Sequence, residues 1–90
     1  MQGEITDMTP LEISEYKMRW MASGTCYSVR LHSDLADNGK TWCRRNLERH
    51  QWSVATWTDV YEHTFFFEHK HDADEFVKQW PKYTNQQKGQ

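Results

Sequence analysis

The sequence has little cysteine, glycine or proline, and each shortage excludes a class of protein. Its 90 residues include two cysteines, four glycines and two prolines. Cys26 and Cys43 are too few for a disulfide scaffold and lie far from any CxxC spacing, so free thiols are expected. Four glycines leave little scope for a phosphate-cradling loop, and the motifs of hydrolases, metalloproteases and dinucleotide-binding enzymes are missing. We therefore predict that the protein is not an enzyme and needs no cofactor.

Signals for export and for membrane insertion are also missing. The N-terminal MQGEITDMTP lacks the basic and apolar regions of an export signal, and nowhere do 18 apolar residues run together. Only 37% of the residues are hydrophobic, but five Trp, four Tyr and four Phe can supply a core. We expect a folded protein of the cytoplasm, or of the host cytoplasm if the chain is viral, with no membrane partner. A short, tryptophan-rich sequence without motifs is typical of small accessory proteins of phages and mobile elements.

The net charge of −2 conceals a segregation of charge along the chain. Residues 1–15 hold four acids and no base, and residues 16–50 hold seven bases against three acids. Residues 51–90 hold four bases against six acids. A basic middle third can steer an anionic partner to one side of the molecule, although a charged stretch is usually a solvated helix surface.

Hydrophobic periodicity predicts an α+β protein. Alternation favours strands over residues 15–21, 26–32, 51–58 and 63–69, and helical spacing favours helices over 34–50 and 73–80. A rival signal, Thr9-Pro10-Leu11-Glu12, resembles a capping box with proline at the first helical position, and a helix starting there would run through Met21. We predict a helical turn at 10–14 followed by the first strand. Asn38-Gly39 weakens the start of the helix over 34–50, which would delay its first turn.

The predicted fold is a four-stranded antiparallel sheet with two helices on one face, in the order ββαββα. The alternative is a ferredoxin-like βαββα arrangement, which applies if the first segment is a helix. The predicted organisation has an acidic N-terminal segment with a short helical turn at 1–14, a single α+β domain at 15–83 and a disordered polar tail at 84–90.

One face of such a sheet would carry no helix. Alternation places basic residues of the first two strands on it beside Phe66, and Trp57 joins them if Trp52 and Val54 are buried. Because aromatic residues and arginine dominate interface hot spots, we predict a protein partner or self-association there. The predicted binding residues are Trp57, Phe66, Arg19, Arg30 and Lys17. Single-stranded nucleic acid is the alternative ligand of this face, but the net charge of −2 and the lack of an RRM-type motif oppose it.

The basic helix is a second candidate site. An acidic partner or a phosphate backbone could bind its cations, although a solvated helix surface explains them more simply. These candidate nucleic-acid contacts are Lys40, Arg44, Arg45 and Arg49.

The histidines His69 and His71 are a third candidate. On an extended chain this H-x-H would place two imidazoles on a zinc or nickel ion, but a site normally needs a third ligand. Asp72 and Glu75 have a competing role, because D-x-x-E just before an apolar run resembles the cap of a helix.

Overall fold

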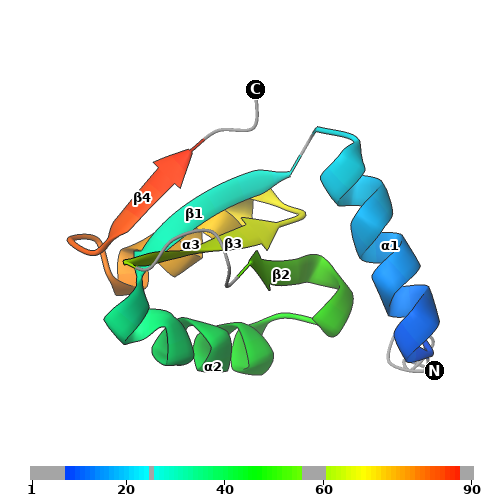
Figure 1. The fold of residues 1–90 in the computed structure, drawn as a ribbon, viewed down its shortest axis with the longest axis horizontal. Helices are drawn as coiled ribbons and strands as arrows, with labels where there is room; N and C mark the ends of the chain where they lie inside the picture. Colours follow the sequence, from blue (N-terminus) through cyan, green and yellow to red (C-terminus); the bar gives the residue numbers. More distant parts are fainter. Residues whose placement is uncertain (1–7, 25, 56–60, 88–90) are drawn as a thin grey trace.

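The computed structural model describes residues 8–24, 26–55 and 61–87 of the chain. Four strands form one sheet, in which β2 pairs with β3, β3 with β1 and β1 with β4, every pair antiparallel. The predicted α+β class with a four-stranded antiparallel sheet is therefore confirmed. The elements, shown in Figure 1, are α1 (Pro10–Ala22), β1 (Tyr27–His32), η1 (Ser33–Leu35), α2 (Ala36–Asn46), η2 (Arg49–Gln51), β2 (Trp52–Ala55), β3 (Glu62–Phe67), α3 (Lys70–Gln79) and β4 (Thr84–Gln87).

The first segment is a helix throughout, because its capping box forms. The Thr9 hydroxyl accepts from the Glu12 N–H at 3.2 Å, and the Thr9 N–H donates to Glu12 Oε1 at 2.9 Å. Helical spacing then buries Ile13 and Trp20 on one face and leaves Met18 67% exposed on another. The strand predicted over 15–21 is thus wrong, since its alternation of apolar residues is overridden by the local start signal.

The end of the chain contains a strand that the sequence did not indicate. Residues 84–87, predicted to be part of a disordered tail, form β4 and pair with β1, with Thr84 opposite Leu31. A turn after α3 reverses the chain, and in it the Tyr83 N–H donates to the Trp80 carbonyl at 3.0 Å. With β4 included, the elements after α1 follow the order βαββαβ, and the strand order is that of a ferredoxin-like sheet. The ferredoxin-like alternative thus describes the topology better than ββαββα.

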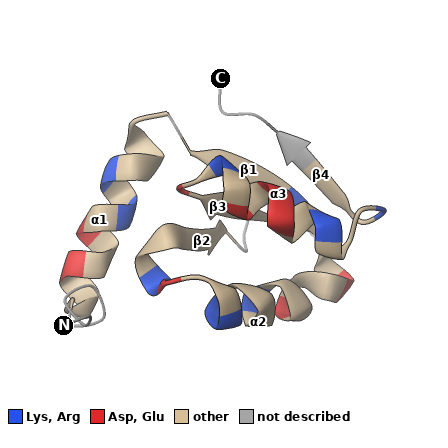
Figure 2. Cartoon of the chain, turned by 180° about the vertical axis from the view of Figure 1, so that it is seen from behind, with Lys and Arg blue, Asp and Glu red and all other residues tan. Residues whose placement is uncertain are grey.

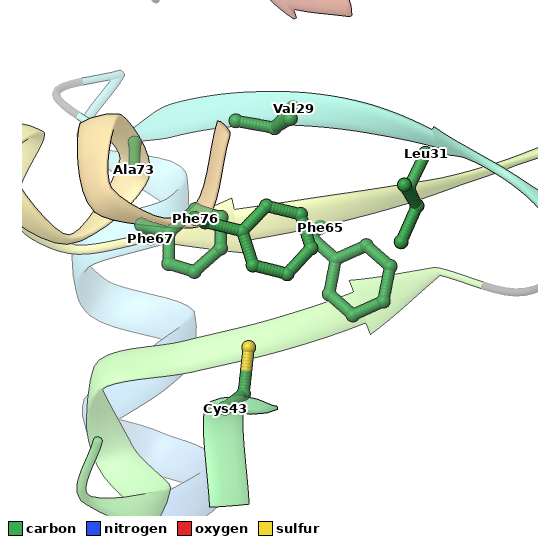
Figure 3. Packing of buried hydrophobic residues seen from close by; sticks show 7 residues of the cluster. All are labelled: Val29, Leu31, Cys43, Phe65, Phe67, Ala73 and Phe76. Carbon is green, nitrogen blue, oxygen red and sulfur yellow. The ribbon is translucent and has the colours of Figure 1, made fainter. Parts of the chain in front are cut away.

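The core lies between the sheet and the two helices α2 and α3, which cover the same face, as predicted. Val29 and Leu31 of β1 and Phe65 and Phe67 of β3 point toward the helices and are fully buried. Phe76 of α3 lies at the centre, with its ring 4.8 Å from Phe65 and 5.1 Å from Phe67 between centroids. Ala73 of α3 and Cys43 of α2 complete the cluster (Figure 3).

Gly39 allows α2 to pass close to this core. A Cβ atom at this position would lie 2.8 Å from the Leu31 side chain and 3.0 Å from the rings of Phe65 and Phe76. Helix α2 begins at Ala36, so the prediction that Gly39 would delay the helix is wrong. The glycine serves the packing of the helix on the sheet.

Helix α1 is attached at one end of the sheet, as both Figure 1 and Figure 2 show. The Trp20 indole N–H donates to the His50 carbonyl at 2.9 Å, and the Tyr16 ring meets His50 edge-on at 5.0 Å. The Tyr16 hydroxyl donates to Glu68 Oε2 at 2.6 Å, and this bond raises the pKa of Tyr16. Helix α1 thus packs mainly on η2.

No helix in the described part of the chain is long and apolar enough to cross a membrane.

Candidate functional site

The sheet face opposite α2 and α3 is built from alternate residues of the strands. Because Phe65 and Phe67 point to the core, Phe66 between them points to this other face. Strand register sets Phe66 between Ser28 of β1 and Ser53 of β2, two small polar residues. The result is an open face whose described strand residues include the ring of Phe66 and, at the end of β1, the imidazole of His32.

Charge on the open face is balanced locally. Arg30 of β1 lies opposite Thr64, on the same face as Phe66. Its Nη1 atom lies 3.7 Å from Glu62 Oε1, and both side chains are partly exposed. The open face therefore presents an aromatic ring beside a pair of opposite charges.

Of the residues predicted to bind a partner, Phe66 and Arg30 lie on the open face. Lys17 and Arg19 do not, because the segment that carries them is α1. The Lys17 amine lies over the ring of Trp52, 5.7 Å from its centroid, and the Arg19 guanidinium lies 5.8 Å from that of Tyr16. Trp57 lies outside the described residues.

A second candidate site, a cluster of basic side chains around a tryptophan, lies beside α1. Its residues come from separate segments of the sequence. Lys17 of α1, Arg44 of α2, Arg49 of η2 and Trp52 of β2 line one hollow of about 340 Å³. Figure 2 shows the basic positions on α1, near the start of β2 and on α2. Burial lowers the pKa of Lys17, and the charge of Arg49 lowers it further. The packing of α1 on η2 thus brings three cations together.

Trp52 forms the aromatic wall of this hollow. Its ring stacks on Phe65, with centroids 6.4 Å apart and planes inclined by 21°. The Lys17 amine also lies over this ring, 5.7 Å from its centroid. The indole N–H is closed to solvent and has no hydrogen-bond partner among the described residues. Trp52 and Val54 are half-buried and pack against the core cluster, so of the two assignments open for this strand the structure takes the one that buries them. The place of Trp52 in a charged hollow is not indicated by the sequence.

The four cations predicted as one basic helix face are divided. Arg44 and Arg49 line the hollow with Trp52, whereas Arg45 lines a separate hollow of about 400 Å³ with Trp42 and Trp80. Lys40 is half-buried and belongs to neither of these linings. The four cations therefore do not form one continuous basic helix face, and only Arg44 and Arg49 lie together.

The two histidines of the H-x-H do not lie on an extended chain, because α3 begins at Lys70. His69 is the N-cap residue, without a side-chain capping bond, and His71 is in the first turn, so the predicted cap at Asp72 is wrong. His69 lies 3.5 Å from Glu68, and the strongly exposed His71 lies 3.6 Å from Asp72. Within residues 8–24, 26–55 and 61–87, no three or more His, Cys, Asp or Glu side chains are grouped to hold a metal ion.

Cys26 and Cys43 are both free thiols, and burial makes Cys43 unreactive. Cys43 is fully buried in the core, and burial, followed by the charge of Asp72, raises the pKa of its thiol to about 12. A thiol with that pKa is protonated at neutral pH and cannot act as a nucleophile. Cys26 is half-buried.

Comparisons with known proteins found no matching family model, no matching curated protein and no matching solved structure.

Proposed function

We propose that this protein is a non-catalytic interaction module whose open sheet face docks onto another protein or a second copy of itself. Phe66 carries the proposal. Helices α2 and α3 occupy the opposite face of the sheet, and α1 packs on η2 at one end. The ring of Phe66, on the sheet face opposite α2 and α3, is partly exposed and therefore accessible to a partner.

The surroundings of Phe66 suit a protein surface. Ser28 and Ser53 on either side are small, so a partner can approach the ring closely across the two neighbouring strands. An aromatic anchor surrounded by less important contacts is the common pattern of an interface hot spot. The pair of Arg30 and Glu62 gives the face both signs of charge, which is compatible with pairing of this face with itself about a two-fold axis.

Single-stranded nucleic acid is a poorer occupant of this face. Nucleobase binding uses several stacking rings together with cations that are free to meet phosphates. Among the described strand residues of the face, Phe66 is the one Phe, Tyr or Trp ring, His32 adds an imidazole, and Arg30 has Glu62 as a neighbour at 3.7 Å. The metal-binding role, the cytoplasmic location and the phage or mobile-element origin remain predictions from the sequence.

Self-association provides the first test. We expect Phe66→Ala to weaken self-association or capture of a protein partner about thirtyfold or more, since hot-spot truncations cost about 2 kcal/mol or more. Sedimentation velocity over a concentration series measures the first, and affinity capture with quantitative mass spectrometry measures the second.

Leu11→Ala is the matched control, because Leu11 is an apolar side chain that is 67% exposed on α1, away from the sheet. This variant should behave as the unmodified protein in both assays. If Phe66→Ala changes neither association nor capture, or if Leu11→Ala changes them equally, the open face is not the docking surface.

A further inference from the structure

We infer that the hollow lined by Lys17, Arg44, Arg49 and Trp52 is a binding site for a phosphate monoester group. This site lies between α1, α2, η2 and β2, and it is separate from the open sheet face and independent of the function proposed for that face. The evidence for this site is the convergence of three cations in one hollow and, within the described residues, the lack of a carboxylate within ion-pair distance of any of them.

The charge of the hollow is uncompensated within the described part of the chain. Three cations from three different elements line it, and none of them has a described carboxylate within ion-pair distance. Like charges so placed repel one another, and the lowered pKa of Lys17 reflects burial and the nearness of Arg49. An anion in the hollow would remove this repulsion.

Purely structural roles account for part of the cluster. Arg44 lies in the last turn of α2, where a cation suits the negative end of the helix dipole. Lys17 gains a cation–π contact from its place over Trp52. Neither effect explains why Arg49 joins them from a third element, and neither explains why none of the three pairs with a described carboxylate. A shared anionic ligand explains both.

The chemistry of the hollow favours a phosphate monoester over other anions. A monoester carries a charge of about −1.5 to −2 at pH 7 and three strong acceptor oxygens, which suits three cations better than a single carboxylate or phosphodiester charge does. Arginine forks pair with phosphate oxygens in a bidentate manner. Trp52 forms the aromatic wall of the hollow, and Lys17, Arg44 and Arg49 supply the hydrogen-bond donors.

The test begins with inorganic phosphate as the probe and the full-length chain in low salt at pH 7.5. A titration followed by two-dimensional nitrogen–proton NMR should show saturable shifts at Lys17, Arg44, Arg49 and the Trp52 indole N–H. Arg49→Gln and Arg44→Gln should each weaken the binding about tenfold or more, because hydrogen bonds to charged groups carry that magnitude.

Arg45→Gln is the matched control, since Arg45 neighbours Arg44 in the same helix turn but lines the other hollow. It should change phosphate affinity by less than about twofold, as expected for a screened surface charge. The three arginines are exposed, so their variants should fold, and thermal unfolding checks that they do. Phe66→Ala should leave phosphate binding unchanged, which separates a failure of this site from a failure of the sheet-face proposal.

Further probes identify the ligand class. Free O-phosphoserine and a phosphoserine peptide should both bind more tightly than acetate and than the unphosphorylated peptide. If the phosphoserine peptide binds more tightly than O-phosphoserine, the natural ligand is a phosphorylated protein. If the two bind equally, the natural ligand is a small phosphate monoester. The inference is overturned if phosphate produces no saturable shifts, if acetate binds equally well, or if Arg45→Gln weakens binding as much as Arg49→Gln does. Tighter binding of oligothymidylate than of every monoester would also overturn it, because the cations would then serve a nucleic-acid backbone.

Discussion

Replacing Gly39 by alanine adds a methyl group at the closest approach of α2 to the core. The new Cβ would meet the Leu31 side chain at 2.8 Å and the rings of Phe65 and Phe76 at 3.0 Å. Carbon atoms prefer separations of about 3.5–4.0 Å, so either α2 or its neighbours must move. All three neighbours are fully buried and come from β1, β3 and α3, so none can turn away into solvent.

Two opposing effects set the magnitude for Gly39→Ala. Alanine in a helix interior is favoured over glycine by about 1 kcal/mol. Overpacking of a close-packed core costs about 1–3 kcal/mol, and three simultaneous contacts place this site in the upper part of that range. We therefore expect a net loss of about 1–2 kcal/mol in the free energy of unfolding. For a domain of this size, each kcal/mol corresponds to about 4–8 °C in Tm.

Urea unfolding followed by circular dichroism measures this loss, and Asn38→Ala provides the control. Asn38 is exposed in the same turn of α2, so its replacement should stabilise the helix slightly, by about 0.5 kcal/mol. If Gly39→Ala stabilises the protein as much as Asn38→Ala does, the close approach of α2 to Leu31, Phe65 and Phe76 is refuted.

Two further predictions concern α1 and the core thiol. Tyr16→Phe should lower the free energy of unfolding, measured in urea, by about 1–3 kcal/mol, because Glu68 Oε2 loses its 2.6 Å hydrogen bond and Glu68 Oε1 already has no hydrogen-bond partner among the described residues. The control Tyr83→Phe, at an exposed tyrosine, should cost less. Equal losses for the two variants would contradict the contact between α1 and Glu68. The pKa of the Cys43 thiol rises from 9.0 to about 12 on folding, so its contribution to stability is fully present below pH 9.0 and is lost as the pH rises toward 12. Maleimide at pH 8 should therefore label Cys26 well before Cys43, and comparable rates would contradict the burial of Cys43.

The central part of the fold could be predicted because periodicity and burial agree there. Val29 and Leu31 alternate with polar residues, and Phe65 and Phe67 flank Phe66, so the sequence itself assigns the core face. Cross-strand pairing places Val29 directly opposite Phe65, so the core face predicted for one strand agrees with that predicted for its neighbour.

The first segment shows how two local signals compete. Tyr16, Met18 and Trp20 alternate as in a strand, but Ile13 and Trp20 also share one helix face. The capping box at Thr9 favours the helix, since it satisfies backbone N–H groups of the first turn with local side-chain partners. The start signal at Thr9 therefore outweighs an alternation of only five residues.

Strand β4 and the charged hollow depend on contacts between distant segments. The polar sequence of β4 has no hydrophobic pattern, and its pairing comes from backbone groups at the edge of β1. The cations of the hollow each resemble a solvated surface charge when taken alone. Lys17 meets Arg49 and Trp52 because α1 packs on η2, an arrangement that no local pattern encodes.

Protein binding at the open sheet face is tested most directly by a photoreactive benzoyl derivative of phenylalanine placed at position 66. Irradiation should link this position to a protein, either a second copy or one specific partner, and the same group at position 11 should give no such product. Equal products at both positions, the lack of any protein adduct at 66, or an adduct with nucleic acid would contradict the proposed function.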